Sequence, residues 1–182
     1  MAAQDASPEA GLATAITLYN AGRRADAEAR CAQLLARHGA HPAVDQLMAV
    51  LCQERGDAVA ARRHIARCLA LRPGHAPSLL VAALVAQDLH DLEAAEAALA
   101  QVLQQQPAHV AAAVNLGIVN LEQGRLDDAM ARFGAAWRQR PETFGRIANA
   151  LCSERAGAVW LDAAALKAAL GAGAGAALNA AA

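Results

Sequence analysis

Histidine and cysteine are the residues of this chain whose types and spacing could support chemistry. His41, His75 and His109 recur every 34 residues, which raises the question of a shared metal ion. Equivalent atoms of stacked helical units lie about 10 Å apart, whereas zinc binds histidine nitrogens at about 2 Å. We therefore expect no metal site, and we expect these three histidines to be solvent-facing turn residues.

The cysteines show no spacing typical of a metal or redox site. None of the four forms a CxxC pair, and three fall on apolar helix faces that suit a small hydrophobic residue; they are Cys31, Cys52, Cys68 and Cys152. We expect free thiols in a reducing compartment, with a Cys52–Cys68 disulfide as the alternative.

Catalytic motifs are not evident. Ser7, Ser78 and Ser153 lack the flanking glycines of a hydrolase nucleophile. The glycines of residues 171–175 follow no strand and precede no helix with a suitable acidic partner, so they do not predict a nucleotide loop. We expect a protein that is not an enzyme and that needs no cofactor.

A 34-residue repeat organises the chain and must position any functional residue. Ala27, Ala61, Ala95 and Ala129 share one slot of the repeat. A turn slot holds Gly22, Gly56, His90 and Gly124, and a third slot holds Gly39, Pro73, Pro107 and Pro141. Such a frame predicts an array of units over 8–41, 42–75, 76–109 and 110–143, with an imperfect fifth over 144–170.

Each unit has the pattern of two helices joined by a tight turn. In the second unit Val44, Leu47, Met48 and Leu51 define one apolar helical face, and Gly56 interrupts it before a second periodic segment. The chain is 56% hydrophobic but only 3% aromatic, and alanine favours thin, closely packed helices. An all-α fold is predicted.

The fourth unit carries the clearest family pattern: Asn115-Leu116-Gly117, Gly124-Arg125-Leu126, Ala129, Phe133, Ala136 and Pro141. It resembles a tetratricopeptide repeat. The resemblance covers residues 8–170 and implies an all-α, right-handed α-solenoid of stacked antiparallel helix pairs. It also implies that the first helix of every pair lines a concave groove. The family's early Trp slot departs from the pattern, since it holds Gly11, Asp45, Leu79 and Ala113.

The resemblance places a partner-binding groove along the first helices. Its lining is mostly aliphatic and would include Leu12, Ile16, Tyr19, Leu47, Val50, Leu80, Val81, Leu84, Gln87, Val114, Asn115, Ile118, Leu121 and, in the imperfect unit, Asn149. The basic clamp by which some members hold a terminal carboxylate is replaced by Leu47, Leu80 and Val81. An apolar groove instead favours an amphipathic helix or an extended apolar segment.

Asn115 is the polar exception in this lining. Its amide could hold a bound peptide backbone in register, because it both donates and accepts hydrogen bonds. The alternative is that it bonds a neighbouring helix end or water. Asn149 could play the same part in the fifth unit.

The two ends of the chain have separate predictions. Residues 1–7 are expected to be disordered, and residues 171–182 to form a flexible Ala/Gly tail. Residues 159–170 predict an amphipathic helix, with Trp160, Leu161, Ala165, Leu166 and Leu170 on its apolar face. This helix would cap the array. Alternatively it would fold into the groove, or enter the groove of a second molecule and form a homodimer.

Charge and hydropathy limit the partners and the location. The 16 basic and 17 acidic residues nearly balance, so neither nucleic acid nor an anionic membrane is expected as a partner. Residues 76–109 carry only acidic charges, which are either a solvated face or a band that orients a basic partner. Neither a secretory signal nor a membrane span is evident, so a cytoplasmic protein is expected. The excess of Ala, and of Arg over Lys, suggests a bacterial source.

These observations together predict a non-enzymatic scaffold or adaptor that binds an apolar segment of a partner protein in its groove. Two alternatives remain open. One is an accessory or regulatory subunit of a bacterial enzyme such as a glycosyl or sulfate transferase. The other is a chaperone or assembly factor for secretion or envelope machinery.

Overall fold

The computed structural model describes residues 7–152 and 163–172, and their regular structure is helical throughout. The helices are α1 (Pro8–Asn20), α2 (Arg24–His38), α3 (Pro42–Glu54), α4 (Ala58–Leu71), α5 (Ala76–Asp88), α6 (Leu92–Gln105), α7 (Val110–Glu122), α8 (Leu126–Gln139), α9 (Phe144–Leu151) and α10 (Ala163–Ala172), with a 3-10 turn η1 (Pro141–Thr143) before α9. The first helices of the four full repeats begin 34 residues apart, and so do the second helices. The predicted all-α fold is confirmed.

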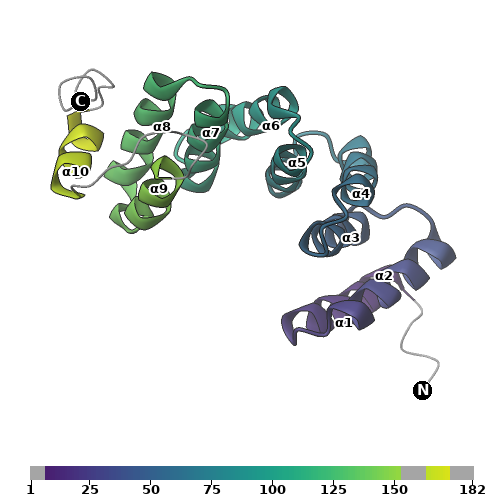
Figure 1. Cartoon of the computed structure of the whole chain (residues 1–182). Coiled ribbons are helices and arrows are strands. Elements are labelled where there is room, and N and C mark those ends of the chain that lie inside the picture. The colour runs from purple at the N-terminus through teal and green to yellow at the C-terminus, as the bar shows by residue number, and fades with distance from the viewer. Residues whose placement is uncertain (1–6, 153–162, 173–182) are drawn as a thin grey trace. The chain divides into compact units, whose positions relative to one another are not determined.

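The helices form two compact units, Met1–His90 with α1 to α5 and Asp91–Ala182 with α6 to α10. In the N-terminal unit α1 pairs with α2, α3 pairs with α4, and α5 packs on both α3 and α4 (Figure 1). In the C-terminal unit α7 packs between α6 and α8, while α9 and η1 follow. Each unit thus stacks complete helix pairs with one helix of the third repeat, α5 in the N-terminal unit and α6 in the C-terminal unit.

A left-handed residue closes the turn inside each full repeat. The φ angle is +74° at Gly22, +84° at Gly56 and +76° at Gly124. The third repeat has His90 in this slot, with φ +56°, and among the described residues it is the only non-glycine with a positive φ. Glycine adopts this conformation without steric cost, whereas a β-carbon makes it unfavourable.

Side-chain caps fix where many of the helices begin. Ser7, His41, Asp57, Asp91 and His109 each accept a hydrogen bond from the backbone N–H three residues later. His41 and His109 do so through Nδ1, and both side chains are half-buried. The expectation of solvent-facing turn histidines therefore needs correction, because these residues cap the first helices of their repeats.

The alanine slot lies on the buried side of the second helix of each full repeat. Ala27, Ala61, Ala95 and Ala129 are all fully buried. Close packing of two helices leaves room for one β-carbon but not for a larger side chain. The close pairs α1–α2, α3–α4 and α7–α8 therefore account for alanine at this slot.

Helix α10 packs on α8 and covers the last full repeat. Leu166, Ala169 and Leu170 are buried in one cluster with α8 and α9 residues. A β-carbon at Gly134 of α8 would lie 2.6 Å from the backbone oxygen of Leu170, so the helices touch at this glycine. Arg138 also donates to that oxygen, at 3.2 Å. Helix α10 thus lies on the last full repeat as the capping alternative predicts. Its bounds differ from the predicted 159–170, and Ala165 of the predicted apolar face is exposed.

Some predictions for the ends concern residues outside the described part of the chain. Trp160 and Leu161 of the predicted capping helix are among them, as are residues 1–6 and 173–182 of the predicted disordered end and tail. Ser7, in contrast, is described and caps α1.

Candidate functional site

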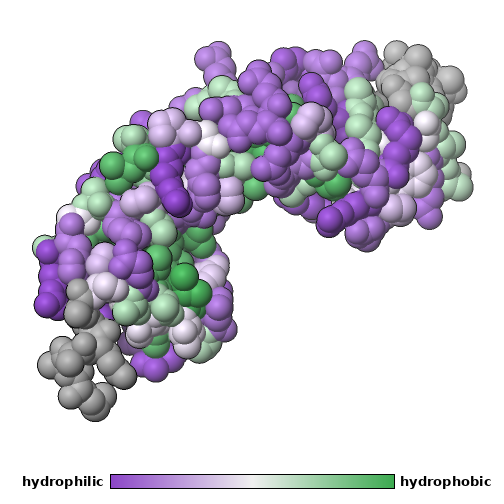
Figure 2. All heavy atoms as spheres, turned by 180° about the vertical axis from the view of Figure 1, so that it is seen from behind, coloured by the Kyte–Doolittle hydropathy of each residue, from purple (hydrophilic) through white to green (hydrophobic). Residues whose placement is uncertain are grey.

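Three aliphatic residues form a row across the first helices of the N-terminal unit. Ile16, Val50 and Leu84 occupy one slot of the repeat on α1, α3 and α5, and α3 contacts both of the other helices. Ile16 is 43% exposed and Leu84 36% exposed, while Val50 is half-buried. We call these residues the aliphatic row. Hydrophobic side chains at the surface of this unit are visible at the lower left of Figure 2.

The other predicted lining residues of this unit are partly accessible. Leu12, Tyr19, Leu47 and Val81 pack against the core cluster while keeping some exposed surface. Leu80 and Gln87 of α5 are also half-buried. The face thus combines two well-exposed aliphatic residues with a half-buried apolar surround.

An acidic edge runs beside the aliphatic row. Tyr19 Oη donates to Glu54 Oε1 at 2.6 Å, and Arg24 Nε donates to Glu54 Oε2 at 2.6 Å. One repeat later Gln53 Nε2 donates to Asp88 Oδ2 at 3.0 Å. These bonds connect α1 to α3 and α3 to α5, so the carboxylates of Glu54 and Asp88 hold fixed positions at the ends of their helices.

Hydrogen bonding also sets the charge state at this edge. The bonds from Tyr19 and Arg24 lower the pKa of the Glu54 carboxyl, and the bond to Glu54 raises the pKa of Tyr19. Both hydrogen bonds favour the ionised carboxylate. None of α1, α3 and α5 contains Lys or Arg. The first-helix face of this unit is therefore apolar. At its edge Glu54 is ion-paired with Arg24 of α2, and the Asp88 carboxylate is bonded by the uncharged Gln53.

The predicted lining residues of the C-terminal unit are less open. Val114 is 1% exposed and belongs to the core cluster, against which Ile118 and Leu121 pack as half-buried residues. Asn115 is 5% exposed, and its Oδ1 accepts a hydrogen bond from Arg146 Nη2 of α9. The oxygen of the predicted peptide-holding amide thus already has a partner on the neighbouring helix.

Arg146 and Asn149 lie on the exposed surface of α9. Arg146 was not predicted as part of the site, because the fifth repeat is imperfect and its frame does not place Arg146 beside Asn115. The Arg146–Asn115 hydrogen bond places a guanidinium on this surface. The aliphatic lining residues predict a surface that is only apolar.

The N-terminal unit also contains a buried carboxylate that the sequence did not predict. Asp45 of α3 is fully buried, in the slot where the family has Trp. Its Oδ1 lies 2.9 Å from His64 Nδ1 and 3.2 Å from Arg67 Nη2, and its Oδ2 accepts from the His41 backbone N–H at 3.3 Å. Burial of a charge is tolerated because these donors surround it. The cluster joins α3 to α4 and has a structural role.

The nucleophilic side chains of this unit are enclosed. Ser78 is fully buried, where its Oγ lies 2.8 Å from His75 Nδ1, 3.1 Å from Cys68 Sγ and 3.1 Å from Gln46 Oε1. Burial raises the pKa of the Cys31 thiol to about 11. A substrate cannot reach these atoms in the folded unit, and a thiol with a raised pKa is a poor nucleophile at neutral pH.

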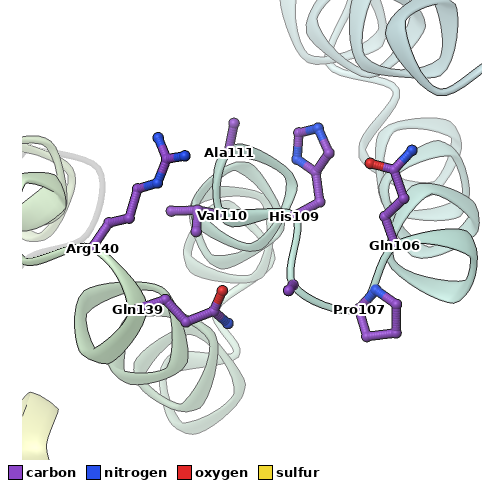
Figure 3. Close-up of a pocket in the computed structure, with 8 residues that line it drawn as sticks. Gln106, Pro107, His109, Val110, Ala111, Gln139 and Arg140 are labelled. Atoms are coloured by element: carbon purple, nitrogen blue, oxygen red, sulfur yellow. The ribbon is translucent and has the colours of Figure 1, made fainter.

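The C-terminal unit also has an open depression of about 560 Å³. It lies between the turn that precedes α7 and the end of α8, with Gln106, Pro107, His109, Gln139 and Arg140 around it (Figure 3). His109 Nδ1 already accepts the Ala112 N–H at 3.1 Å. The depression is mixed in polarity and separate from the aliphatic row, so it is a weaker candidate site.

The described part of the chain has no helix long and apolar enough to span a membrane. Its His, Cys, Asp and Glu residues likewise form no group of three or more suited to bind a metal ion.

Comparison with known proteins places this architecture. Residues 86–151 match the family model described as tetratricopeptide repeat. The fold is similar to that of TTC0263, a TPR protein of Thermus thermophilus, at 25% identity, with 81% of this chain and 83% of that chain covered and a TM-score of 0.67. It is also similar to MamA from Desulfovibrio magneticus RS-1, at 17% identity over 75% of this chain and 77% of that chain, with a TM-score of 0.69.

A tetratricopeptide repeat protein from Parabacteroides merdae is similar as well, at 18% identity over 82% of this chain and 59% of that chain, with a TM-score of 0.73. A comparison with curated proteins finds no match.

Proposed function

Because this chain is a tetratricopeptide repeat protein, we propose that it is a scaffold that holds a segment of a partner protein on the first-helix face of its N-terminal unit. Proteins of this family generally act as non-enzymatic interaction modules. The observation that carries the proposal is the aliphatic row, because Ile16 and Leu84 keep 43% and 36% of their surface exposed on α1 and α5, the two first helices that contact α3. Exposed apolar surface gathered on one face is typical of protein-binding sites.

The spacing of the row favours an amphipathic helix as the bound segment. Packed helices lie about 8 to 10 Å apart, so neighbouring residues of the aliphatic row are separated by about that distance. Positions i and i+7 of an α-helix lie about 10.5 Å apart on one face. A partner helix with an apolar residue at every seventh position would therefore meet Ile16, Val50 and Leu84 in turn. An extended apolar segment is the alternative occupant.

The acidic edge would set the charge of the partner. Glu54 is ion-paired with Arg24 of α2, so the negative charge offered to a partner is chiefly that of Asp88, which Gln53 holds in place. The first helices of this unit carry no Lys or Arg. A partner helix with Lys or Arg beside its apolar stripe would meet this edge favourably, and an acidic one would be repelled. The proposed partner segment is therefore amphipathic and basic.

The test is affinity purification of partners from the source cells with the doubly substituted chain Ile16→Asp/Leu84→Asp. Each charge would lie in the apolar contact, so we expect loss of the partners that the unsubstituted chain retains. Ala32→Asp, at an exposed position of α2 in the same unit, is the matched control and should retain them. Thermal unfolding by circular dichroism would establish that all variants fold.

Retention of every partner by the double variant would exclude the first-helix face as the binding surface. The nature of the retained proteins also separates the functional classes. A stoichiometric enzyme would indicate an accessory subunit, and an unfolded or export-bound client would indicate a chaperone.

A further inference from the structure

The outer side of α4 differs from the rest of the N-terminal unit. Its exposed residues follow helical spacing, so they lie on one side of the helix. Helix α4 packs on α3 and α5 (Figure 1). They include Val59, Arg62, Arg63, Ala66, Arg67 and Leu71. We call this surface the α4 stripe.

Large hydrophobic side chains lie at both ends of the α4 stripe. Val59 is 65% exposed and Leu71 is 51% exposed, which makes them the two most exposed large hydrophobic residues in the described part of the chain. Neither is needed to close the core of a repeat. They are twelve positions apart, or about 18 Å along the helix axis.

The charges between these two residues are all positive. Helix α4 contains Arg62, Arg63 and Arg67 and no Asp or Glu. Arg67 reaches inward to the buried Asp45, yet its side chain remains 47% exposed. By contrast, the other second helix of this unit, α2, mixes its arginines with acidic residues. A surface of one sign with apolar ends has the composition of an interaction surface.

We propose that the α4 stripe is a second docking surface, separate from the first-helix face, and that it takes an acidic amphipathic helix of a partner protein. The partner helix would lie along α4, with apolar residues about three turns apart over Val59 and Leu71. Its Asp and Glu side chains between them would meet Arg63 and the exposed part of Arg67, whose guanidinium also bonds Asp45. Arginine suits this role because its planar group binds carboxylates in a bidentate manner.

The same chemistry argues against nucleic acid as the occupant. Phosphates would make no favourable apolar contact with Val59 and Leu71. Three arginines on one helix are also few for binding a duplex, because affinity grows with each phosphate that is neutralised. An acidic amphipathic helix of a protein would complement both the arginines and the apolar ends of the α4 stripe.

A synthetic peptide provides the probe. It is a labelled helix of about 18 residues with two leucines about eleven positions apart, a spacing that places them on one face, and with glutamates between them on that face. A peptide of identical composition in scrambled order is its control, and a labelled DNA duplex of similar charge is the alternative ligand. Binding to the full chain would be followed by fluorescence anisotropy at two salt concentrations.

We expect the ordered peptide to bind about tenfold more tightly than the scrambled one. Arg63→Glu should weaken it about tenfold by placing like charges together, and Val59→Ser/Leu71→Ser should weaken it to a similar extent. Arg37→Glu, the same charge reversal at an exposed position of α2, should change affinity less than about twofold. Arg63→Gln replaces the reversal variant if circular dichroism shows that Arg63→Glu does not fold.

Four results would overturn the proposal. Equal binding of the scrambled peptide, or an equal loss with Arg37→Glu, would reduce the surface to general charge attraction. Tighter binding of the duplex with no effect of Val59→Ser/Leu71→Ser would assign the stripe to nucleic acid. A doubled molar mass by light scattering, with no peptide bound, would assign it to contact between two copies of this chain.

Discussion

Gly117 of α7 faces the ring of Phe133 on α8 so closely that a β-carbon at Gly117 would lie 2.5 Å from the ring carbon Cε1. In the second repeat the same two slots hold Ala49 and Ile65, which are buried in one cluster. The larger ring is thus matched by the smaller partner. The two slots share a fixed volume at the crossing of the helix pair, and the sequence of each repeat divides it differently.

Gly117→Ala tests this shared volume. Alanine favours a helix over glycine by about 1 kcal/mol, which alone would stabilise α7. We expect instead a loss of about 1 to 3 kcal/mol from overpacking against Phe133, measured by urea unfolding. Adding Phe133→Leu should make the Gly117→Ala change less costly, and a double-mutant cycle with no coupling would contradict the contact.

His90→Gly should stabilise the chain, since His90 holds a φ of +56° in a slot where the other repeats have glycine. The gain is expected to be about 0.5 to 1 kcal/mol, because relief of the left-handed strain exceeds the added entropy of the unfolded chain. Gly56→Ala, at the same slot with φ +84°, is the reverse control and should destabilise. A lower melting temperature for His90→Gly would indicate that its side chain makes a stabilising contact.

His109→Ala should cost about 1 kcal/mol through loss of the cap on α7, whose Ala112 N–H donates to His109 Nδ1 at 3.1 Å. Asparagine is a strong cap, so His109→Asn should retain most of the stability. The measurement is the free energy of unfolding of the three proteins in urea. Equal losses in both variants would mean that the imidazole contributes packing and not capping.

Alkaline pH should weaken the fold through Cys31. Burial raises the pKa of this thiol from 9.0 to about 11 in the folded state. Between those values the unfolded chain releases the proton while the folded chain keeps it, so stability falls as pH rises, by up to about 2 to 3 kcal/mol near pH 11. Below pH 9 the contribution is constant.

The matched variant for this pH dependence is Cys31→Ala, which removes the ionisable group. Its free energy of unfolding should decline less steeply than that of the unsubstituted chain between pH 9 and 10.5. Parallel curves for the two proteins would show that the Cys31 thiol does not titrate differently on unfolding.

The period of the sequence predicts a large part of the fold. Ala27 and its three equivalents are buried, and the turn slot of Gly22 is left-handed in all four repeats, because both features depend only on contacts within one repeat. Contacts within a repeat recur wherever the same residues recur. The 34-residue period therefore predicts them without knowledge of how neighbouring repeats pack.

Exposure of the predicted lining could not be read in the same way. Leu84 is open, but Val114 is buried in a cluster that includes Ile147 and Leu151 of α9. Whether a first-helix residue reaches solvent depends on the size and placement of the next helix, and α9 belongs to the imperfect fifth repeat. The same irregularity concealed the hydrogen bond between Arg146 and Asn115.

The contact between Gly134 and Leu170 has a consequence for anyone who would redesign this protein. Earlier repeats have alanine in the slot of Gly134, namely Ala32, Ala66 and Ala100. Ala32 and Ala66 are exposed, so this slot is uncovered in the first two repeats, whereas α10 covers it at Gly134. An engineer who restored alanine at position 134 would place a β-carbon against the backbone of Leu170 and displace α10, so this one glycine decides whether a covering helix can pack on α8.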